Sequence, residues 1–283
     1  MTHPDPYDLP LSVVEALAPV TRRLVLNRRG STVWEVGNER GRWAVKLGYP
    51  IAATRDWPAQ PWTALAPARE GAVLRQITCD AVLYGVWEHG TWNVQPWREG
   101  RNLYDLWEPC RSGETPMTPG LAHAAACAEA LAALHAQGWV HGDIQPAHFI
   151  IGPGGAHLID LALACGGEVP AEYDFPYRGC LVHYESPEIS RSVLASGTAV
   201  PTMQGDMYAL GASLLISATG RRHVAYPDDA PRTVQRQAIV DSPHRPVTVP
   251  GVLGKLIEQM LSPVPADRPT SAEVYNELNQ QRW

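Results

Sequence analysis

The sequence predicts an α+β protein with a small, β-rich N-terminal lobe that carries one main helix, followed by a larger, mainly helical lobe. Residues 24–47 and 81–96 are rich in β-forming residues with turn residues between them, which favours strands. After Pro96 the composition shifts to Ala-rich, helix-forming stretches, and a length of 283 residues suits two packed lobes. The expected parts are residues 1–95 for the first lobe, 96–100 for a hinge and 101–283 for the second lobe.

Composition and charge exclude several classes of protein. Hydrophobic residues make up 45% of the chain and charged residues 18%, which is typical of a globular protein and not of a disordered one. The 23 basic and 29 acidic residues give a formal net charge of −6, so the chain has no basic field for a phosphate backbone or an anionic membrane. We therefore expect neither a nucleic acid nor a membrane among its partners.

The cysteines and the N-terminus indicate a cytoplasmic protein. The five cysteines stand singly and form no C-x-x-C pair, which favours reduced thiols over a disulfide framework or a zinc site. Residues 1–8 carry acids and prolines in place of the basic start and apolar run of a signal peptide. The uncharged stretches at 144–159 and 207–220 are too short, or too rich in Gly and Pro, to span a membrane.

The elements of the first lobe follow from changes of period along the chain. Residues 33–36 and 43–47 are β-formers separated by turn residues at 37–41, which predicts a hairpin. Residues 64–77 have apolar side chains at helical spacing and predict a helix. Residues 81–96 then return to short strand-like runs, so this lobe is predicted to be a sheet crossed by one helix.

The second lobe begins with an Ala-rich helix that the signals at Thr118-Pro119-Gly120 and Gly138 delimit. A second hairpin is predicted where residues 149–151 and 157–159 flank the bend Gly152-Pro153-Gly154-Gly155. Three later helices are predicted, at 206–218, at 252–261 and from Thr270 onward, where Thr270-Ser271-Ala272-Glu273 fits a capping box.

Asp143 and Asp160 are the first candidates for chemistry. The predicted hairpin lies between them and folds the chain back, so both carboxylates are expected to emerge at the same edge. Neighbouring carboxylates repel unless a cation lies between them, and Mg²⁺ prefers oxygen ligands. The alternative is that either aspartate only caps a turn.

Lys46 is the second candidate, because it lies within an otherwise apolar strand and an unpaired ammonium facing a core is costly. Glu70, on the following helix, is the natural anionic partner. The alternative is that Lys46 lies on the solvated face of an edge strand.

Taken in order, seven motifs resemble the signature set of the bilobal protein kinase fold, in a divergent, bacterial Ser/Thr-kinase-like form with a His-Gly-Asp catalytic loop. The resemblance covers residues 22–280. Its motifs are Ala44-Val45-Lys46, Glu70, His141-Gly142-Asp143, Asp160-Leu161-Ala162, Tyr184-Glu185-Ser186-Pro187-Glu188, Asp206-Met207-Tyr208-Ala209-Leu210-Gly211 and Asp267-Arg268-Pro269.

The resemblance implies roles for these residues. Lys46, paired with Glu70, is expected to bind the ATP phosphates, and Asp160 to bind Mg²⁺. Asp143 is expected to orient the acceptor hydroxyl. The resemblance also implies that Arg268 pairs with Glu188.

The resemblance places adenine near residues 95–98. Gln95, Pro96 and Arg98 are the candidate contacts in this stretch. The Pro96 carbonyl can accept a hydrogen bond, although Pro96 has no N–H to donate.

Several positions depart from the family pattern. The three glycine positions of the phosphate-binding loop fall on Leu26, Arg28 and Ser31. Gln145 stands where Ser/Thr kinases carry a lysine that neutralises the transferred phosphate. His148 stands where an asparagine would hold the second Mg²⁺, and an imidazole is a poorer ligand for Mg²⁺ than a carbonyl oxygen.

Two further departures concern the segment after Asp160. Leu161-Ala162 replaces Phe-Gly and removes a glycine hinge. Gly142 replaces the arginine that would receive a phosphate from the activation segment, and Ser186 is the only Ser or Thr between Asp160 and Glu188. Activation by Ser/Thr phosphorylation of this segment is therefore not expected.

Three functions remain open at this point. The first is ATP- and Mg²⁺-dependent phosphotransfer to a Ser/Thr hydroxyl of a protein or peptide. The second is a pseudokinase that binds a nucleotide or a partner protein as a scaffold, which the lost glycines, Gln145 and His148 favour. The third is a kinase of a small molecule or of a natural-product precursor peptide, because His-Gly-Asp is also the form found in such enzymes.

Overall fold

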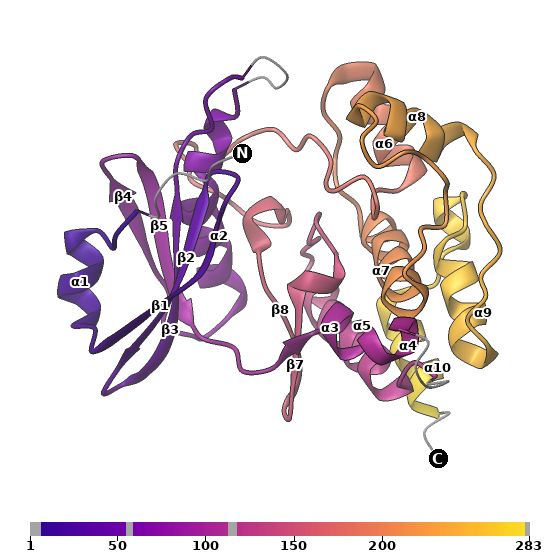
Figure 1. Cartoon of the computed structure of the whole chain (residues 1–283), viewed down its shortest axis with the longest axis horizontal. Helices are drawn as coiled ribbons and strands as arrows, with labels where there is room; N and C mark the ends of the chain where they lie inside the picture. The colour runs from indigo at the N-terminus through magenta and orange to yellow at the C-terminus, as the bar shows by residue number, and fades with distance from the viewer. Residues whose placement is uncertain (1–6, 55–58, 113–117, 281–283) are drawn as a thin grey trace. The chain divides into compact units, whose positions relative to one another are not determined.

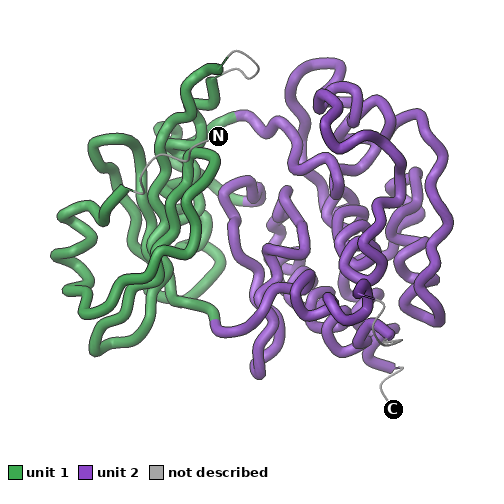
Figure 2. The backbone as a smooth tube through the Cα atoms, in the orientation of Figure 1, with its two compact units in different colours: residues 1–98, 167–175 green, residues 99–166, 176–283 purple. Residues whose placement is uncertain are grey.

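The computed structural model describes residues 7–54, 59–112 and 118–280. The chain divides into two compact units (Figure 2). Unit 1 comprises residues 1–98 and 167–175, and unit 2 comprises residues 99–166 and 176–283. A β-rich N-terminal unit and a helical C-terminal unit confirm the predicted α+β class.

Unit 1 is built on a five-stranded antiparallel sheet of order β1-β2-β3-β5-β4 (Figure 1). The strands are β1 (Thr21–Arg28), β2 (Ser31–Asn38), β3 (Gly41–Gly48), β4 (Leu83–Trp87) and β5 (Gly90–Pro96). The predicted hairpin is β2–β3, with Asn38 paired to Gly41 at its turn. Because β5 lies between β3 and β4, strand β3 is central in the sheet and is paired on both sides.

Helices cover both faces of this sheet (Figure 1). The short helix α1 (Leu11–Leu17), which the sequence did not predict, packs its buried Val13 and Leu17 against Val36 and Val45. The predicted helix is α2 (Ala66–Ile77), and it contacts β3, β4 and β5 on the other face. Since side chains alternate along a strand, the residues at 46, 91, 93 and 95 face α2 while those at 45, 92 and 94 face the α1 side.

Unit 1 also contains the segment 167–175, which lies against α2. Gln76 Nε2 donates to the Glu168 carbonyl at 2.6 Å, and Arg69 Nε lies 3.3 Å from Asp174 Oδ1. The Arg69 guanidinium also stacks over the Phe175 ring, 5.3 Å from its centroid. These contacts attach a segment distant in sequence to the helix that carries Glu70.

Unit 2 combines a small antiparallel sheet with eight helices among its described residues. The sheet has the order β6-β7-β8, with β6 at Arg101–Asn102, β7 at Phe149–Gly152 and β8 at Gly155–Leu158, so β7 and β8 form the predicted second hairpin. The helices are α3 (Leu103–Leu106), α4 (Glu108–Ser112), α5 (Leu121–Ala136), α6 (Pro187–Ser196), α7 (Met203–Thr219), α8 (Arg232–Asp241), α9 (Gly251–Met260) and α10 (Ser271–Gln280).

Helix α7 is the core of unit 2, because every residue from Asp206 to Ala218 is buried. It starts three residues before the predicted position, since the Thr202 side chain accepts the Gly205 N–H and caps its N-terminus. The predicted capping box of α10 is confirmed: Glu273 Oε2 accepts the Thr270 N–H at 2.7 Å, and Thr270 Oγ1 accepts the Glu273 N–H at 3.2 Å.

Candidate active site

Lys46 and Glu70 form a buried ion pair in unit 1. Lys46 Nζ lies 2.8 Å from Glu70 Oε1, and their side chains are 13% and 1% exposed. Strand β3 is central, so the alternative of a solvated edge-strand lysine is wrong. Burying these two charges costs desolvation free energy, and the pair holds the ammonium in place. Charged groups buried at such a cost are common where an anionic ligand must be bound.

Asn93 holds the second oxygen of this carboxylate. It lies opposite Lys46 in the β3–β5 pairing and is fully buried. Its Nδ2 donates to Glu70 Oε2 at 3.0 Å and to the Pro67 carbonyl at 2.8 Å, and its Oδ1 accepts from Gln95 Nε2 at 3.2 Å. The chain of contacts therefore runs from Lys46 through Glu70 and Asn93 to Gln95.

The candidate adenine contacts are Gln95 and Pro96 at the end of β5, and Arg98 just after it. The Gln95 side chain is buried and bonded to Asn93, and Pro96 is the last residue of the strand. The next residue, Trp97, donates its backbone N–H to the Arg42 carbonyl at 2.9 Å and so extends the ladder. Arg98 forms an ion pair with Asp80, so its charge is already partnered within unit 1.

The phosphate-loop positions lie in a tight hairpin. Strands β1 and β2 remain paired up to Arg28 opposite Ser31, so Leu26, Arg28 and Ser31 are all strand residues. The connection is the two-residue turn Arg29-Gly30, and both residues have positive φ. Gly30 is required there, because a Cβ would lie 2.7 Å from the Tyr49 carbonyl oxygen.

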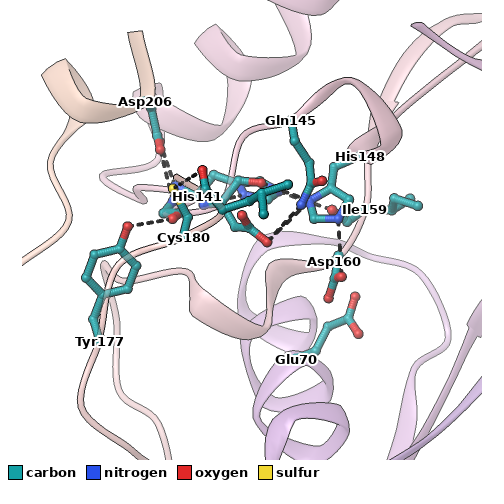
Figure 3. Close-up of polar contacts among 12 residues, drawn as sticks. Glu70, His141, Gln145, His148, Ile159, Asp160, Tyr177, Cys180 and Asp206 are labelled. Atoms are coloured by element: carbon teal, nitrogen blue, oxygen red, sulfur yellow. Dashed lines mark hydrogen bonds and ion pairs between the residues drawn. The ribbon is translucent and has the colours of Figure 1, made fainter. Parts of the chain in front are cut away.

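The His141-Gly142-Asp143 loop of unit 2 is anchored by Asp206 on α7 (Figure 3). Asp206 accepts the backbone N–H of His141 at 2.7 Å and that of Gly142 at 2.9 Å. His141 Nε2 lies 3.1 Å from the Ile159 carbonyl oxygen and so ties the loop to the segment before Asp160. Desolvation by burial lowers the pKa of His141, which favours its neutral form.

The backbone conformation and the packing at position 142 require a residue without a side chain. The φ of Gly142 is +76°, and a Cβ would lie 2.9 Å from the Leu163 carbonyl oxygen. The Tyr177 hydroxyl donates to the Gly142 carbonyl at 2.8 Å (Figure 3). The glycine that replaces arginine therefore fits a closely packed backbone turn.

Asp143 is a half-buried carboxylate: 17% of its side chain is exposed, and one of its two oxygens has a hydrogen-bond partner. Its Oδ2 accepts from Gln145 Nε2 at 3.2 Å, whereas its Oδ1 has no hydrogen-bond partner among the described residues. Burial raises the pKa of Asp143, with a smaller contribution from the negative charge of Asp160. A carboxylate with a raised pKa and an oxygen without a hydrogen-bond partner is suited to receive a proton.

His148 brings the two aspartates together. Its Nδ1 lies 2.8 Å from the Asp143 carbonyl oxygen, and its Nε2 lies 3.3 Å from Asp160 Oδ2 (Figure 3). Asp160 itself has left-handed backbone angles, φ 64° and ψ 59°, which an aspartate tolerates better than most residues. The predicted convergence of Asp143 and Asp160 thus occurs around His148.

The donor set of unit 2 fits a divalent cation only in part. Asp160 offers a hard oxygen ligand that suits Mg²⁺, but His148 offers nitrogen, which Mg²⁺ accepts poorly. The described residues contain no group of three or more His, Cys, Asp or Glu that could hold a metal by themselves. A bound ion would therefore need further oxygen ligands from a nucleotide or from water.

The Glu188–Arg268 pair that the resemblance implies is present. Arg268 donates through Nη1 to Glu188 Oε1 at 2.7 Å and through Nη2 to Oε2 at 2.9 Å. Burial alone would raise the pKa of Glu188, but the bonds from Arg268 outweigh it and lower that pKa. Glu185 and Arg236 form a second buried pair at 2.7 Å, which the sequence did not predict.

Sequence reasoning missed Asn93, and it identified Asp206 only as the start of a helix. Asn93 could have been noticed, because it is a polar residue between Trp92 and Val94 in an apolar strand. The anchoring role of Asp206 has no such local signal, because its partners are about 65 residues away in the sequence.

Comparison with known proteins identifies the family. The family model of the protein kinase domain matches residues 93–283, which is more than half of the chain. A serine/threonine-protein kinase of Streptomyces coelicolor, PkaA, is 32% identical over 170 residues. That match covers 55% of this chain and 28% of PkaA.

The chain belongs to the protein kinase domain family. This membership confirms the family that the seven motifs indicated. No helix of the described residues is long and apolar enough to cross a membrane.

Proposed function

We propose that the chain transfers the γ-phosphoryl group of ATP to a Ser or Thr hydroxyl of a protein or peptide. The observation that carries this proposal is Asp143, whose half-buried carboxylate has a raised pKa and an oxygen without a partner among the described residues. A carboxylate in that state suits the residue that accepts the proton of an attacking hydroxyl.

The chain's own residues supply the other needs of this reaction. Lys46, held by Glu70 and Asn93, offers an ammonium for phosphate oxygens. Gln145 donates to Asp143 and fixes the carboxylate that is to receive the proton. Asp160 would bind a divalent ion, which when bound neutralises charge on the transferred phosphoryl group.

In the proposed step the acceptor oxygen bonds to the γ-phosphorus while the bond from that phosphorus to the β–γ bridging oxygen breaks. The hydroxyl proton passes to Asp143, and ADP leaves with the bridging oxygen. Because this transfer depends on position and charge more than on covalent help, a reduced set of residues is sufficient.

The pseudokinase alternative draws on one observation. Leu26, Arg28 and Ser31 are paired strand residues, so the β1–β2 connection has no glycine-rich segment to enclose phosphates. A scaffold that holds a nucleotide or a partner protein without catalysis would need neither that segment nor Asp143.

The test is a labelling assay with γ-labelled ATP, a divalent ion and a cell extract or peptide library as acceptor. We expect label on protein or peptide from the wild type and at least a hundredfold less from Asp143→Asn, about 3 kcal/mol of barrier. The matched control is Asp228→Asn, an 82%-exposed aspartate paired with Arg222, which should keep wild-type activity.

Other outcomes of the assay separate the three functions. ATP binding without label on any acceptor favours the pseudokinase and overturns the proposal. Label on small molecules alone favours a small-molecule kinase. Label on one precursor peptide of a modification pathway would support the proposed phosphotransfer and would identify that peptide as the acceptor.

A further inference from the structure

His148 is the residue whose chemistry least fits a magnesium-dependent kinase. It is buried, with only 11% of its side chain exposed, and it lies between Asp143 and Asp160. We propose that His148 Nε2 and Asp160 Oδ2 together bind one divalent ion, and that this site prefers a transition ion such as Mn²⁺ over Mg²⁺. This inference rests on the proposed function, because the nucleotide must supply the remaining ligands.

The first argument is the orientation of the imidazole ring. A backbone carbonyl can only accept a hydrogen bond, so Nδ1, 2.8 Å from the Asp143 carbonyl oxygen, is the protonated nitrogen. If the ring binds a metal ion as a neutral imidazole, the lone pair of Nε2 would point to the side where Asp160 Oδ2 lies. In metal-bound histidines the ring nitrogen that does not bind the ion usually donates its N–H to a carbonyl or carboxylate, which fixes the orientation of the ring.

The second argument is the distance between the two donor atoms. Nε2 and Oδ2 are 3.3 Å apart. Two adjacent ligands of an octahedral ion with bonds of about 2.2 Å lie about 3.1 Å apart. The pair can therefore bind one ion with a shift of a few tenths of an ångström.

The third argument is the chemistry of the donors. Mg²⁺ strongly prefers oxygen, and it loses its water for a nitrogen ligand reluctantly. First-row transition ions bind imidazole and carboxylate alike, and Mn²⁺ also accepts phosphate oxygens. Asp160 is 44% exposed, so the outer side of the ion would be open to phosphate and water.

The experiment uses the full chain, stripped of metal, with Mn²⁺ and a β,γ-methylene analogue of ATP that has no bridging nitrogen. Electron spin-echo spectroscopy should show ¹⁴N modulation from a ligand nitrogen on the bound Mn²⁺. Labelling histidine with ¹⁵N should change that modulation without any substitution. Competition between the ions should show that the wild type prefers Mn²⁺ at least tenfold more than His148→Asn does.

His157→Asn is the matched control, because His157 lies on β8 of the same unit, opposite Ile150. This variant should keep both the ¹⁴N modulation on bound Mn²⁺ and the wild-type preference for Mn²⁺ over Mg²⁺. Bound Mn²⁺ with oxygen ligands only would overturn the inference and leave the proposed function standing, with His148 acting as a cationic partner of Asp160. Failure of the analogue to bind with either ion would overturn both.

Discussion

Asp206 accepts the backbone N–H of His141 at 2.7 Å and thereby joins the buried helix α7 to the loop that carries Asp143. The same carboxylate accepts the Gly142 N–H and lies 3.0 Å from His135 Nε2. Both oxygens are therefore used, and the side chain is only 3% exposed. The loop is held by charge-assisted hydrogen bonds, which are stronger than neutral ones.

Asp206→Asn should release this loop. An amide can accept through only one oxygen, so one backbone N–H would face an NH₂ group and lose its partner. We expect the free energy of unfolding to fall by about 1–3 kcal/mol and phosphotransfer to fall at least tenfold. Denaturant unfolding and the labelling assay measure the two effects. An active variant with unprotected His141 and Gly142 amides in hydrogen exchange would show that the loop needs no anchor.

Asn93→Leu should weaken nucleotide binding through Glu70. Leucine has a similar size but no donor, so Glu70 Oε2 and the Pro67 carbonyl would each lose a hydrogen bond in a buried place. We expect a stability loss of about 1–3 kcal/mol. We also expect a weaker affinity for an ATP analogue, because the carboxylate that holds Lys46 would no longer be fixed. Calorimetric titration measures that affinity.

Thr91→Val is the matched control for Asn93. Thr91 lies on the same face of β5, is equally buried, and bonds the Ala64 carbonyl and the Ala68 N–H without contacting Glu70. It should lose similar stability and keep nucleotide affinity. Equal losses of affinity in both variants would mean that Asn93 only supports packing.

The sequence predicts those parts of the site that lie in local patterns. Lys46 was recognisable as a charge in an apolar strand, and the hairpin with an aspartate on each side was recognisable from its turn residues. The pairing of His148 with Asp160 was not, because no periodic pattern specifies which side chains meet across a loop.

The same difference between local patterns and distant contacts explains which helices the sequence predicted. The long, apolar helices α5 and α7 were predicted, whereas α6 and α8 were not. Helix α8 is polar, with a sequence of RTVQRQAIVD, and only Gln235, Arg236 and Ile239 are buried. Its position depends on the ion pair of Arg236 with Glu185, 51 residues away, which a local reading does not reveal.

Asp174→Asn should loosen segment 167–175 without unfolding the protein. Asp174 is 57% exposed, so its pair with Arg69 contributes about 0–1 kcal/mol to global stability. Locally, however, the pair helps to attach the segment to α2. We expect faster hydrogen exchange at the amides of Tyr173 and Asp174, which bond to the Pro170 and Ala171 carbonyls.

Glu172→Gln is the control for this prediction, because it removes another exposed carboxylate from the same segment. Its exchange pattern should match that of the wild type. If Asp174→Asn leaves the two amides as slow as before, then the stacking of Arg69 on Phe175 and the bond from Gln76 are sufficient to hold the segment.

His223 should make the protein less stable in mild acid. It is buried beside Tyr208 and His244, and desolvation by burial, followed by the charge of His244, lowers its pKa from 6.5 to about 3. The unfolded chain therefore binds a proton that the folded chain excludes, so this stability is complete above pH 6.5 and is lost as the pH falls toward 3. Between pH 7.5 and 5.0 the loss of unfolding free energy should be about 2 kcal/mol.

Urea unfolding of the wild type and of His223→Gln measures this loss. Because glutamine cannot be protonated, the variant should lose about 2 kcal/mol less over this range. His89→Gln, at a 39%-exposed side chain, should follow the wild type, and an unchanged pH dependence in His223→Gln would assign the acid sensitivity to other groups.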